Sequence, residues 1–188
     1  PDSGPQTPGP ASSPHMLTHR VDGPPGAAAV LLLNGGMMSI AAWDEAAAAL
    51  TPAYRVVRCD FRGQLLTPAL PPADLAAHAD DAIALLDRLG VARVHLVGTS
   101  FGGQVALLLA ARRPERVASL VAVTVVDYPP PSMRAAGARL TALCRQAAAG
   151  GDRRPFFAAM NELLYSPTFR ARFAAELAAR ADVVAALP

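Results

Sequence analysis

A serine stands at the centre of the segment Gly98-Thr99-Ser100-Phe101-Gly102-Gly103, with glycines two residues before and after it. The apolar run 94–97 precedes this segment, and a second apolar run, 105–111, follows it. This order predicts a strand, a sharp turn and a helix, with Ser100 at the apex and its hydroxyl lifted clear of the sheet. We expect glycines there because so tight a turn leaves no room for side chains, and a strained backbone at the serine. A hydroxyl presented in this way can attack a carbonyl carbon as a nucleophile.

The same segment also fits a glycine-rich loop that merely turns the chain. A phosphate-binding loop fits less well, because the glycine spacing differs from G-x-x-x-x-G-K-[ST] and the sequence contains no lysine. The absence of lysine also excludes Schiff-base chemistry and the S-x-x-K arrangement.

Length and composition indicate one domain, with room for a lid. The chain has 188 residues, and 52% of them are hydrophobic, which is ample for a core. All 17 basic residues are arginines and they are scattered, so we expect no nucleic-acid partner. Apolar runs such as 27–33 are much shorter than the roughly 18 residues needed to span a membrane. We expect no membrane contact and, without an export signal, a cytoplasmic location.

Neither the cysteines nor the histidines indicate a metal site. Cys59 and Cys144 lie far apart and form no C-x-x-C, so we expect a reduced pair. The histidines have no partners at metal-ligand spacing; they are His15, His19, His78 and His95. We therefore expect no metal and no cofactor.

Strands and helices alternate along the first two thirds of the chain. The Pro-, Ser- and Gly-rich segment 1–15 predicts a disordered leader. Apolar runs predict strands at 28–33, 56–59, 94–97 and 117–126, and helices at 43–50, 74–89 and 101–112. This alternation predicts an α/β fold with a mostly parallel sheet. After Asp127 we expect three helical stretches, separated by Gly150-Gly151 and by Ser166-Pro167.

Three segments in register resemble the α/β-hydrolase family. Residues 98–102 resemble its nucleophile elbow, and Asn34-Gly35-Gly36 with the later Trp43 resembles its His-Gly-x segment and following tryptophan. Asp60-Phe61-Arg62-Gly63 resembles its D-x-R-G turn. The resemblance covers about 30–127. It implies a sheet of the α/β-hydrolase type in 16–128, incomplete at the C-terminus, and a partial helical cap in 129–188.

The resemblance also implies roles for single residues. Ser100 matches the nucleophile, and the backbone N–H groups of Phe101 and Gly36 match the two donors of an oxyanion hole. A predicted substrate pocket comprises Asn34, Met37, Phe156, Phe157 and Met160, although the cap residues form first of all a packing face and Met37 could equally fill space.

Two segments depart from the family pattern. Asn34 replaces a histidine, which is tolerable because the backbone acts there. Gln64-Leu65-Leu66-Thr67 replaces H-G-x-S, and we expect this change to reshape the loop without touching chemistry. Asp60 and Arg62 could contact substrate, but we expect them instead to stabilise their turn as an ion pair.

The base that a serine nucleophile needs is not evident in the sequence. The family order is serine, acid, histidine, and no histidine follows Ser100. We expect His95 to be a packed or hydrogen-bonded strand residue and His78 to face solvent. Asp127 is a candidate acid, or else a loop or cap residue. We therefore expect an N-terminal part of a hydrolase, with little or no activity by itself.

The sequence thus predicts a serine hydrolase of small-molecule esters, lactones or related acyl compounds, acting through an acyl-enzyme. The alternatives are a non-catalytic remnant of such an enzyme and one half of a two-chain enzyme. An unfinished sheet edge would also favour self-association.

Overall fold

The computed structural model describes residues 17–64, 66–67, 73–126 and 128–186. These residues form two compact units, one up to Val126 and one from Tyr128 onward. The expected leader, 1–15, lies outside the described residues. The strands of the first unit are β1 (His19–Asp22), β2 (Ala29–Leu33), β3 (Arg55–Cys59), β4 (Val94–Thr99) and β5 (Val117–Val123). Its helices are η1 (Ile40–Trp43), α1 (Asp44–Leu50), α2 (Leu75–Arg88), α3 (Phe101–Arg112) and η2 (Pro114–Arg116).

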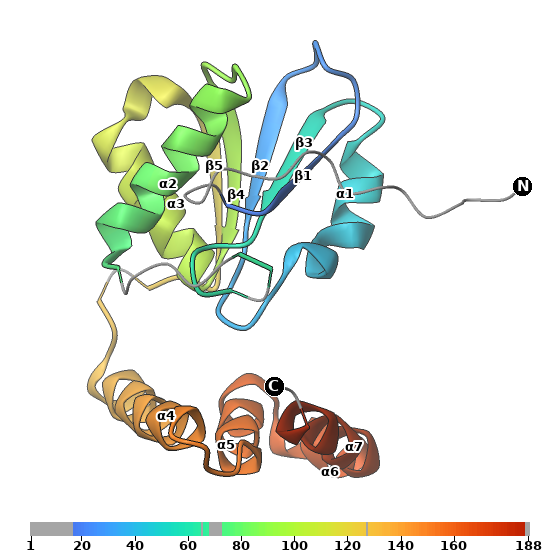
Figure 1. Ribbon diagram of the computed structural model, residues 1–188, viewed down its shortest axis with the longest axis vertical. Helices are drawn as coiled ribbons and strands as arrows, with labels where there is room; N and C mark the ends of the chain where they lie inside the picture. Colours follow the sequence, from blue (N-terminus) through green and yellow to red (C-terminus); the bar gives the residue numbers. More distant parts are fainter. Residues whose placement is uncertain (1–16, 65, 68–72, 127, 187–188) are drawn as a thin grey trace, which may run out of the picture. The chain divides into compact units, whose positions relative to one another are not determined.

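The five strands form one open sheet in the order β1-β3-β2-β4-β5. All neighbours are parallel except β1, which runs antiparallel to β3. Helices α2 and α3 cover one face of this sheet and α1 covers the other (Figure 1). The central strand β2 is buried along its whole length, because it has neighbours on both edges and helices on both faces. The predicted α/β fold with a mostly parallel sheet is therefore confirmed.

The boundaries of several elements differ from those predicted. Strand β1 was not expected, because its four residues alternate charged and uncharged side chains and carry little apolar pattern. Strand β5 ends at Val123 rather than at Val126, since Thr124 adopts a positive φ of 52°. The expected cap at Asp74 is confirmed, because its carboxylate accepts a hydrogen bond from the N–H of Ala77 at 2.9 Å.

The second unit is helical. It consists of α4 (Pro131–Ala148), α5 (Arg154–Leu164), α6 (Pro167–Arg172) and α7 (Ala174–Ala185). The last of the three helical stretches expected there is two helices, because the chain departs from helical geometry at Phe173. None of the helices in the described parts of the chain combines the length and apolar character needed to cross a bilayer.

Candidate active site

The turn between β4 and α3 carries Ser100 in a strained conformation. Its φ of 50° and ψ of −117° lie outside the regions that L residues favour. The backbone N–H of Ser100 donates to the carbonyl of Val123 at 2.9 Å, which ties the turn to the end of β5. The residue is exposed, and its side chain does not cap α3. The predicted strand, turn and helix, and the strained backbone at the serine, are confirmed.

The two glycines of the motif are required by backbone contacts. A Cβ on Gly98 would lie 2.4 Å from the carbonyl oxygen of Gly102, within the turn itself. A Cβ on Gly102 would lie 2.2 Å from the carbonyl oxygen of Leu33, at the end of β2. The first contact explains the tightness of the turn, as predicted. The second places the start of α3 directly against the chain that leaves β2, which was not apparent from the sequence.

The start of α3 presents backbone donors beside the serine. The first N–H groups of an α-helix have no acceptor within the helix, and Phe101 is the first residue of α3. The helix dipole adds partial positive charge at this end. The N–H of Phe101 is therefore one of the free donors at the start of α3, which are suited to stabilise a negative oxygen close to Ser100.

The segment after β2 lies next to this helix start. A Cβ on Gly35 would lie 3.4 Å from the carbonyl oxygen of Thr99, the residue before the serine. Gly36 is exposed, with open space where a side chain would be. Met37 follows it with a φ of 63° and is 57% exposed. The chain thus brings together the predicted nucleophile and the segment that carries the second predicted donor.

A buried polar network holds this segment in place. The Asn34 amide donates to the Asp60 carboxylate at 2.9 Å and to the side-chain oxygen of Gln64 at 3.1 Å. The Asn34 oxygen accepts a hydrogen bond from the Trp43 indole at 2.7 Å. Asp60 also accepts from the backbone N–H of Ile40 at 2.8 Å. Because both donor hydrogens and the oxygen of Asn34 are engaged inside the protein, this side chain fixes the loop and offers no polar group to the predicted substrate pocket.

The expected ion pair between Asp60 and Arg62 does not form. Arg62 instead makes two hydrogen bonds of 2.6 Å to both oxygens of Asp81, on α2. These bonds raise the pKa of Arg62 above its usual value. Asp60 lies fully buried and takes backbone and amide donors instead. Residues two positions apart in a turn can point in different directions, so the charge pattern alone gave the wrong partner.

His78 is buried, contrary to the expectation that it faces solvent. Its ring packs edge-on against Phe61 and Phe101, with centroid distances of 5.4 Å and 4.9 Å. Burial lowers the pKa of His78, and the nearby charge of Arg62 lowers it further. The burial of His78 could have been predicted from helical spacing, because His78 shares one face of α2 with Ala82, which is also buried.

The other residues considered for the catalytic machinery are placed as follows. The His95 ring forms a 2.8 Å hydrogen bond with the Ser119 hydroxyl across β4 and β5, as expected of a strand residue. The His19 ring is hydrogen-bonded to the Leu17 carbonyl oxygen. His15 and Asp127 lie outside the described residues. In the part of the chain that the structure describes, no hydrogen bond joins the Ser100 hydroxyl to a histidine.

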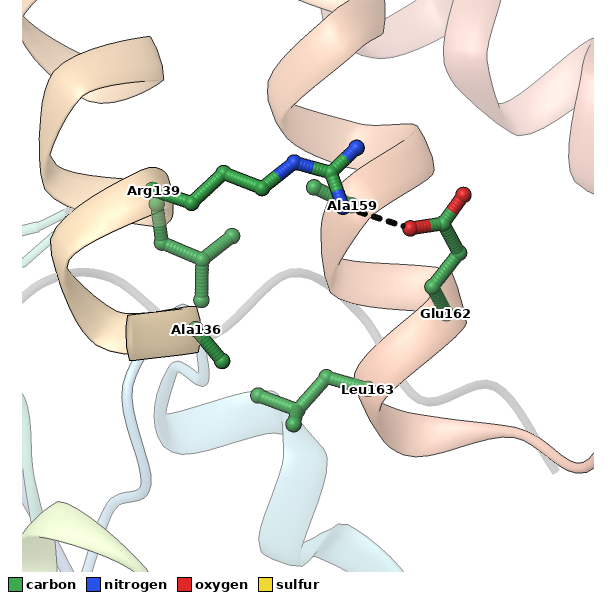
Figure 2. A pocket seen from close by; sticks show the side chains of 6 residues that line it. Ala136, Arg139, Ala159, Glu162 and Leu163 are labelled. Carbon is green, nitrogen blue, oxygen red and sulfur yellow. Dashed lines mark hydrogen bonds and ion pairs between the residues drawn. The ribbon is translucent and has the colours of Figure 1, made fainter. Parts of the chain in front are cut away.

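The predicted pocket residues of the second unit lie on α5. Phe156, Phe157 and Met160 are each half-buried. A pocket of about 180 Å³ lies between α4 and α5, and these three residues do not line it (Figure 2). It is lined by Ala136, Arg139, Leu140, Ala159, Glu162 and Leu163. Arg139 and Glu162 face each other across the helices in a 2.8 Å ion pair. The pocket role of the three α5 residues stays a prediction.

The described residues hold no group of three or more His, Cys, Asp or Glu side chains placed to bind a metal ion. The Cys59 thiol is buried at the end of β3, and burial raises its pKa to about 12. Cys144 is exposed on α4. Both cysteines are free.

Comparison with known proteins decides the family. Residues 28–173 match the sequence profile described as alpha/beta hydrolase fold. The chain belongs to the α/β-hydrolase fold family. This match includes β2 to β5, the Ser100 turn and most of the second unit, so the resemblance stated from three short segments is confirmed over a longer stretch of the chain.

Two curated relatives show how far the sequence similarity extends. The chain is 39% identical over 115 residues to RutD of Caulobacter vibrioides, named a carbamate hydrolase; the match covers 60% of this chain and 43% of that protein. It is 39% identical over 99 residues to the lipase LipV of Mycobacterium tuberculosis, which covers 53% of this chain and 38% of LipV. The chain thus matches less than half the length of these relatives.

Solved structures agree on the fold. A hydrolase from Pseudomonas aeruginosa PA01 superposes with a TM-score of 0.76 at 27% identity, over 90% of this chain and 63% of that one. The enol-lactonase from Burkholderia xenovorans LB400 superposes with a TM-score of 0.71 at 25% identity, over 90% and 64% of the two chains.

Proposed function

We propose that this protein is a serine hydrolase of small-molecule esters, lactones or related acyl compounds, with Ser100 as the nucleophile. The observation that carries the proposal is an exposed serine on a strained turn, placed at the start of α3 and beside the segment after β2. Strain of this kind persists where the surrounding structure enforces it, and it gathers at functional sites. The relatives named as a carbamate hydrolase, a lipase and an enol-lactonase support an acyl substrate.

The proposed reaction has two steps. The Ser100 oxygen attacks the carbonyl carbon while its proton passes to a base, and the C=O electron pair moves onto the oxygen. The N–H groups of Phe101 and Gly36 donate to this oxyanion, and one such donor stabilises the transition state by about 3 kcal/mol. The intermediate then expels the leaving group, which takes up the proton, and leaves the acyl group on Ser100. Water attacks this ester in the same way, which releases the acid and restores the hydroxyl.

The base is the missing part of this scheme. No histidine follows Ser100 in the sequence, and none is hydrogen-bonded to its hydroxyl in the described residues. We therefore propose that the 188-residue chain by itself reacts slowly, because a serine without its base retains only the catalysis of the oxyanion donors. Asp127 stays a candidate for the acid that orients such a base.

A fluorophosphonate probe tests both statements. The chain and its Ser100→Ala variant are incubated with the probe, and labelling is mapped by peptide mass spectrometry. We expect slow labelling confined to Ser100 and lost in the variant. Rapid stoichiometric labelling of Ser100 would contradict the proposed slow reaction but would support the assignment of Ser100 as the nucleophile. Labelling at equal rates in both proteins would contradict the nucleophile.

Among the described residues no histidine is hydrogen-bonded to the Ser100 hydroxyl, and this finding also supports two alternatives. A non-catalytic remnant predicts that Ser100→Ala leaves every measurable behaviour unchanged. One half of a two-chain enzyme predicts hydrolysis of p-nitrophenyl acetate only after mixing with a second chain that supplies the histidine. Titrating the purified chain with candidate partners, at constant ester concentration, separates the two.

We also propose that strand β5 mediates association of two copies of the chain. Among the described residues β5 pairs only with β4, so its other edge is open. Its seven residues carry no charge, and Val121 and Val123 are 51% and 43% exposed. Open, uncharged, apolar edges favour pairing with another strand. Light scattering should show a concentration-dependent dimer that Val121→Lys abolishes.

The matched control for this test is Val183→Lys, which introduces the same charge at an exposed valine of α7. We expect this variant to associate like the unmodified chain. A monomer at every concentration would contradict association through β5, and so would equal association of both variants.

The cytoplasmic location stays a prediction. Fractionation of cells that express the chain, followed by detection with an antibody against it, checks the prediction. Recovery in the membrane fraction would contradict it.

A further inference from the structure

The side chain of Gln64 joins three backbone and side-chain groups around the segment after β2. Its amide nitrogen donates to the carbonyl oxygen of Gly35 at 2.9 Å. Its oxygen accepts from the backbone N–H of Phe61 at 2.9 Å and from the Asn34 amide at 3.1 Å. Because the oxygen has two donors in front of it, the nitrogen must face the Gly35 carbonyl, so the orientation of the amide is determined.

The Gly35 carbonyl and the Gly36 N–H belong to the same peptide bond. A trans peptide is planar, so its C=O and N–H point in opposite directions. A hydrogen bond that holds the oxygen therefore also fixes the direction of the hydrogen. The backbone N–H of Met38 approaches the same oxygen at 3.3 Å, a longer contact.

On its Gly36 side, this peptide has little else to hold it. Glycine residues on both sides have no Cβ, so the backbone can adopt many conformations. Gly36 is exposed, and nothing lies within 4 Å of its Cβ position. Packing therefore does not orient this peptide plane from the Gly36 side, and the shortest restraint on it is the bond from Gln64.

We propose that Gln64 is a positioning residue, which orients the N–H of Gly36 as the second donor to the developing oxyanion. This inference rests on the proposed function of Ser100 and adds a specific residue to it. It also revises the expectation that the loop beginning at Gln64 does not touch the chemistry. Gln64 contacts no substrate in this scheme and acts only through the peptide between Gly35 and Gly36.

The sharpest variant is Gln64→Glu. It keeps the size of the side chain and the oxygen that accepts from Phe61 and Asn34, but an ionised carboxylate cannot donate to the Gly35 carbonyl. Loss of an oxyanion donor costs about 100-fold to 1,000-fold in kcat. Because the donor is misoriented rather than removed, we expect the slow fluorophosphonate labelling of Ser100 to be slower by roughly a further 10-fold to 100-fold in this variant.

The orientation itself is measured by NMR, independently of catalysis. Residual dipolar couplings and hydrogen exchange of the Gly36 N–H are compared in the 188-residue chain, in Gln64→Glu and in Gln64→Leu, which removes both polar atoms. Gln146→Glu on α4 is the matched control. We expect the Gly36 N–H to change direction and exchange faster in both Gln64 variants only. Unchanged Gly36 couplings in folded Gln64 variants would overturn the inference.

Acidification supplies a rescue that a purely structural role would not show. Below its pKa the carboxyl of Gln64→Glu regains one O–H donor, so the Gly36 couplings should return toward those of the unmodified chain. No return would overturn the inference. Loss of Ser100 labelling specificity, by contrast, would overturn the proposed function and leave the Gly36 couplings as they are.

Discussion

The substitution Gly102→Ala tests how closely α3 approaches β2. The new Cβ would lie 2.2 Å from the Leu33 carbonyl oxygen and 2.4 Å from that of Asn34. The shorter distance is about 0.8 Å less than the 3.0 Å that real Cβ contacts keep, and both neighbours are backbone. Overpacking of this kind costs about 1 to 3 kcal/mol. Because neither backbone neighbour can rotate away, we expect a cost at the upper end of this range, about 3 kcal/mol. Helix propensity returns up to about 1 kcal/mol, so the expected net loss is about 2 kcal/mol.

Urea unfolding measures this loss. Trp43 is the single tryptophan and lies in the first unit, so its fluorescence reports on the unit that contains Gly102. The control is Gly137→Ala in α4, where nothing lies within 4 Å of the new Cβ. We expect this control to leave the Trp43 transition unchanged and to stabilise α4 by up to about 1 kcal/mol. A Trp43 midpoint unchanged or raised by Gly102→Ala would refute the close approach.

Two further predictions concern buried titratable groups. Burial lowers the pKa of His78 below that of the unfolded chain, so its stabilising contribution is complete above about pH 6.5. Because the unfolded chain protonates His78 more readily than the folded chain does, the free energy of unfolding should fall as the pH drops below this value. In urea titrations, His78→Leu should reduce this dependence on pH. An equal pH dependence in both proteins would contradict the prediction. The buried Cys59 thiol, with a pKa of about 12, should resist Ellman's reagent in the folded chain, whereas the exposed Cys144 thiol should react. The assay should therefore count one fast-reacting thiol per folded chain and two in urea. Two fast-reacting thiols without urea would contradict the burial of Cys59.

The sequence was sufficient to predict the Ser100 turn because its features are local. Two glycines at fixed spacing, an apolar run before them and a helical run after them describe one continuous segment. The strained φ at the serine follows from that geometry and is confirmed. Residues far apart in the chain gave no comparable pattern. The contact of Gly102 with Leu33 joins two elements that lie far apart in the sequence, and it forms only when the chain folds.

Polar partners were predicted least well. Asp60 and Arg62 lie two positions apart in the sequence, yet Asp60 is hydrogen-bonded to Asn34 and Arg62 to Asp81. Such partners depend on how side chains project from a turn, which charge alone does not specify. In the sequence Gln64 stands out only as a departure from a family pattern, whereas in the structure its amide donates to the Gly35 carbonyl. His78 was misplaced although the spacing of buried residues along α2 would have indicated its burial.

The most direct test of the account supplies the missing base from solution. Ser100 is exposed, so free imidazole can reach its hydroxyl. The chain and its Ser100→Ala variant are treated with p-nitrophenyl acetate, with and without imidazole, and the site of acetylation is mapped by mass spectrometry. The account predicts acetyl groups on Ser100 that depend on imidazole and do not appear in the variant. Acetylation spread evenly over other hydroxyls, with none favoured at Ser100, would contradict it.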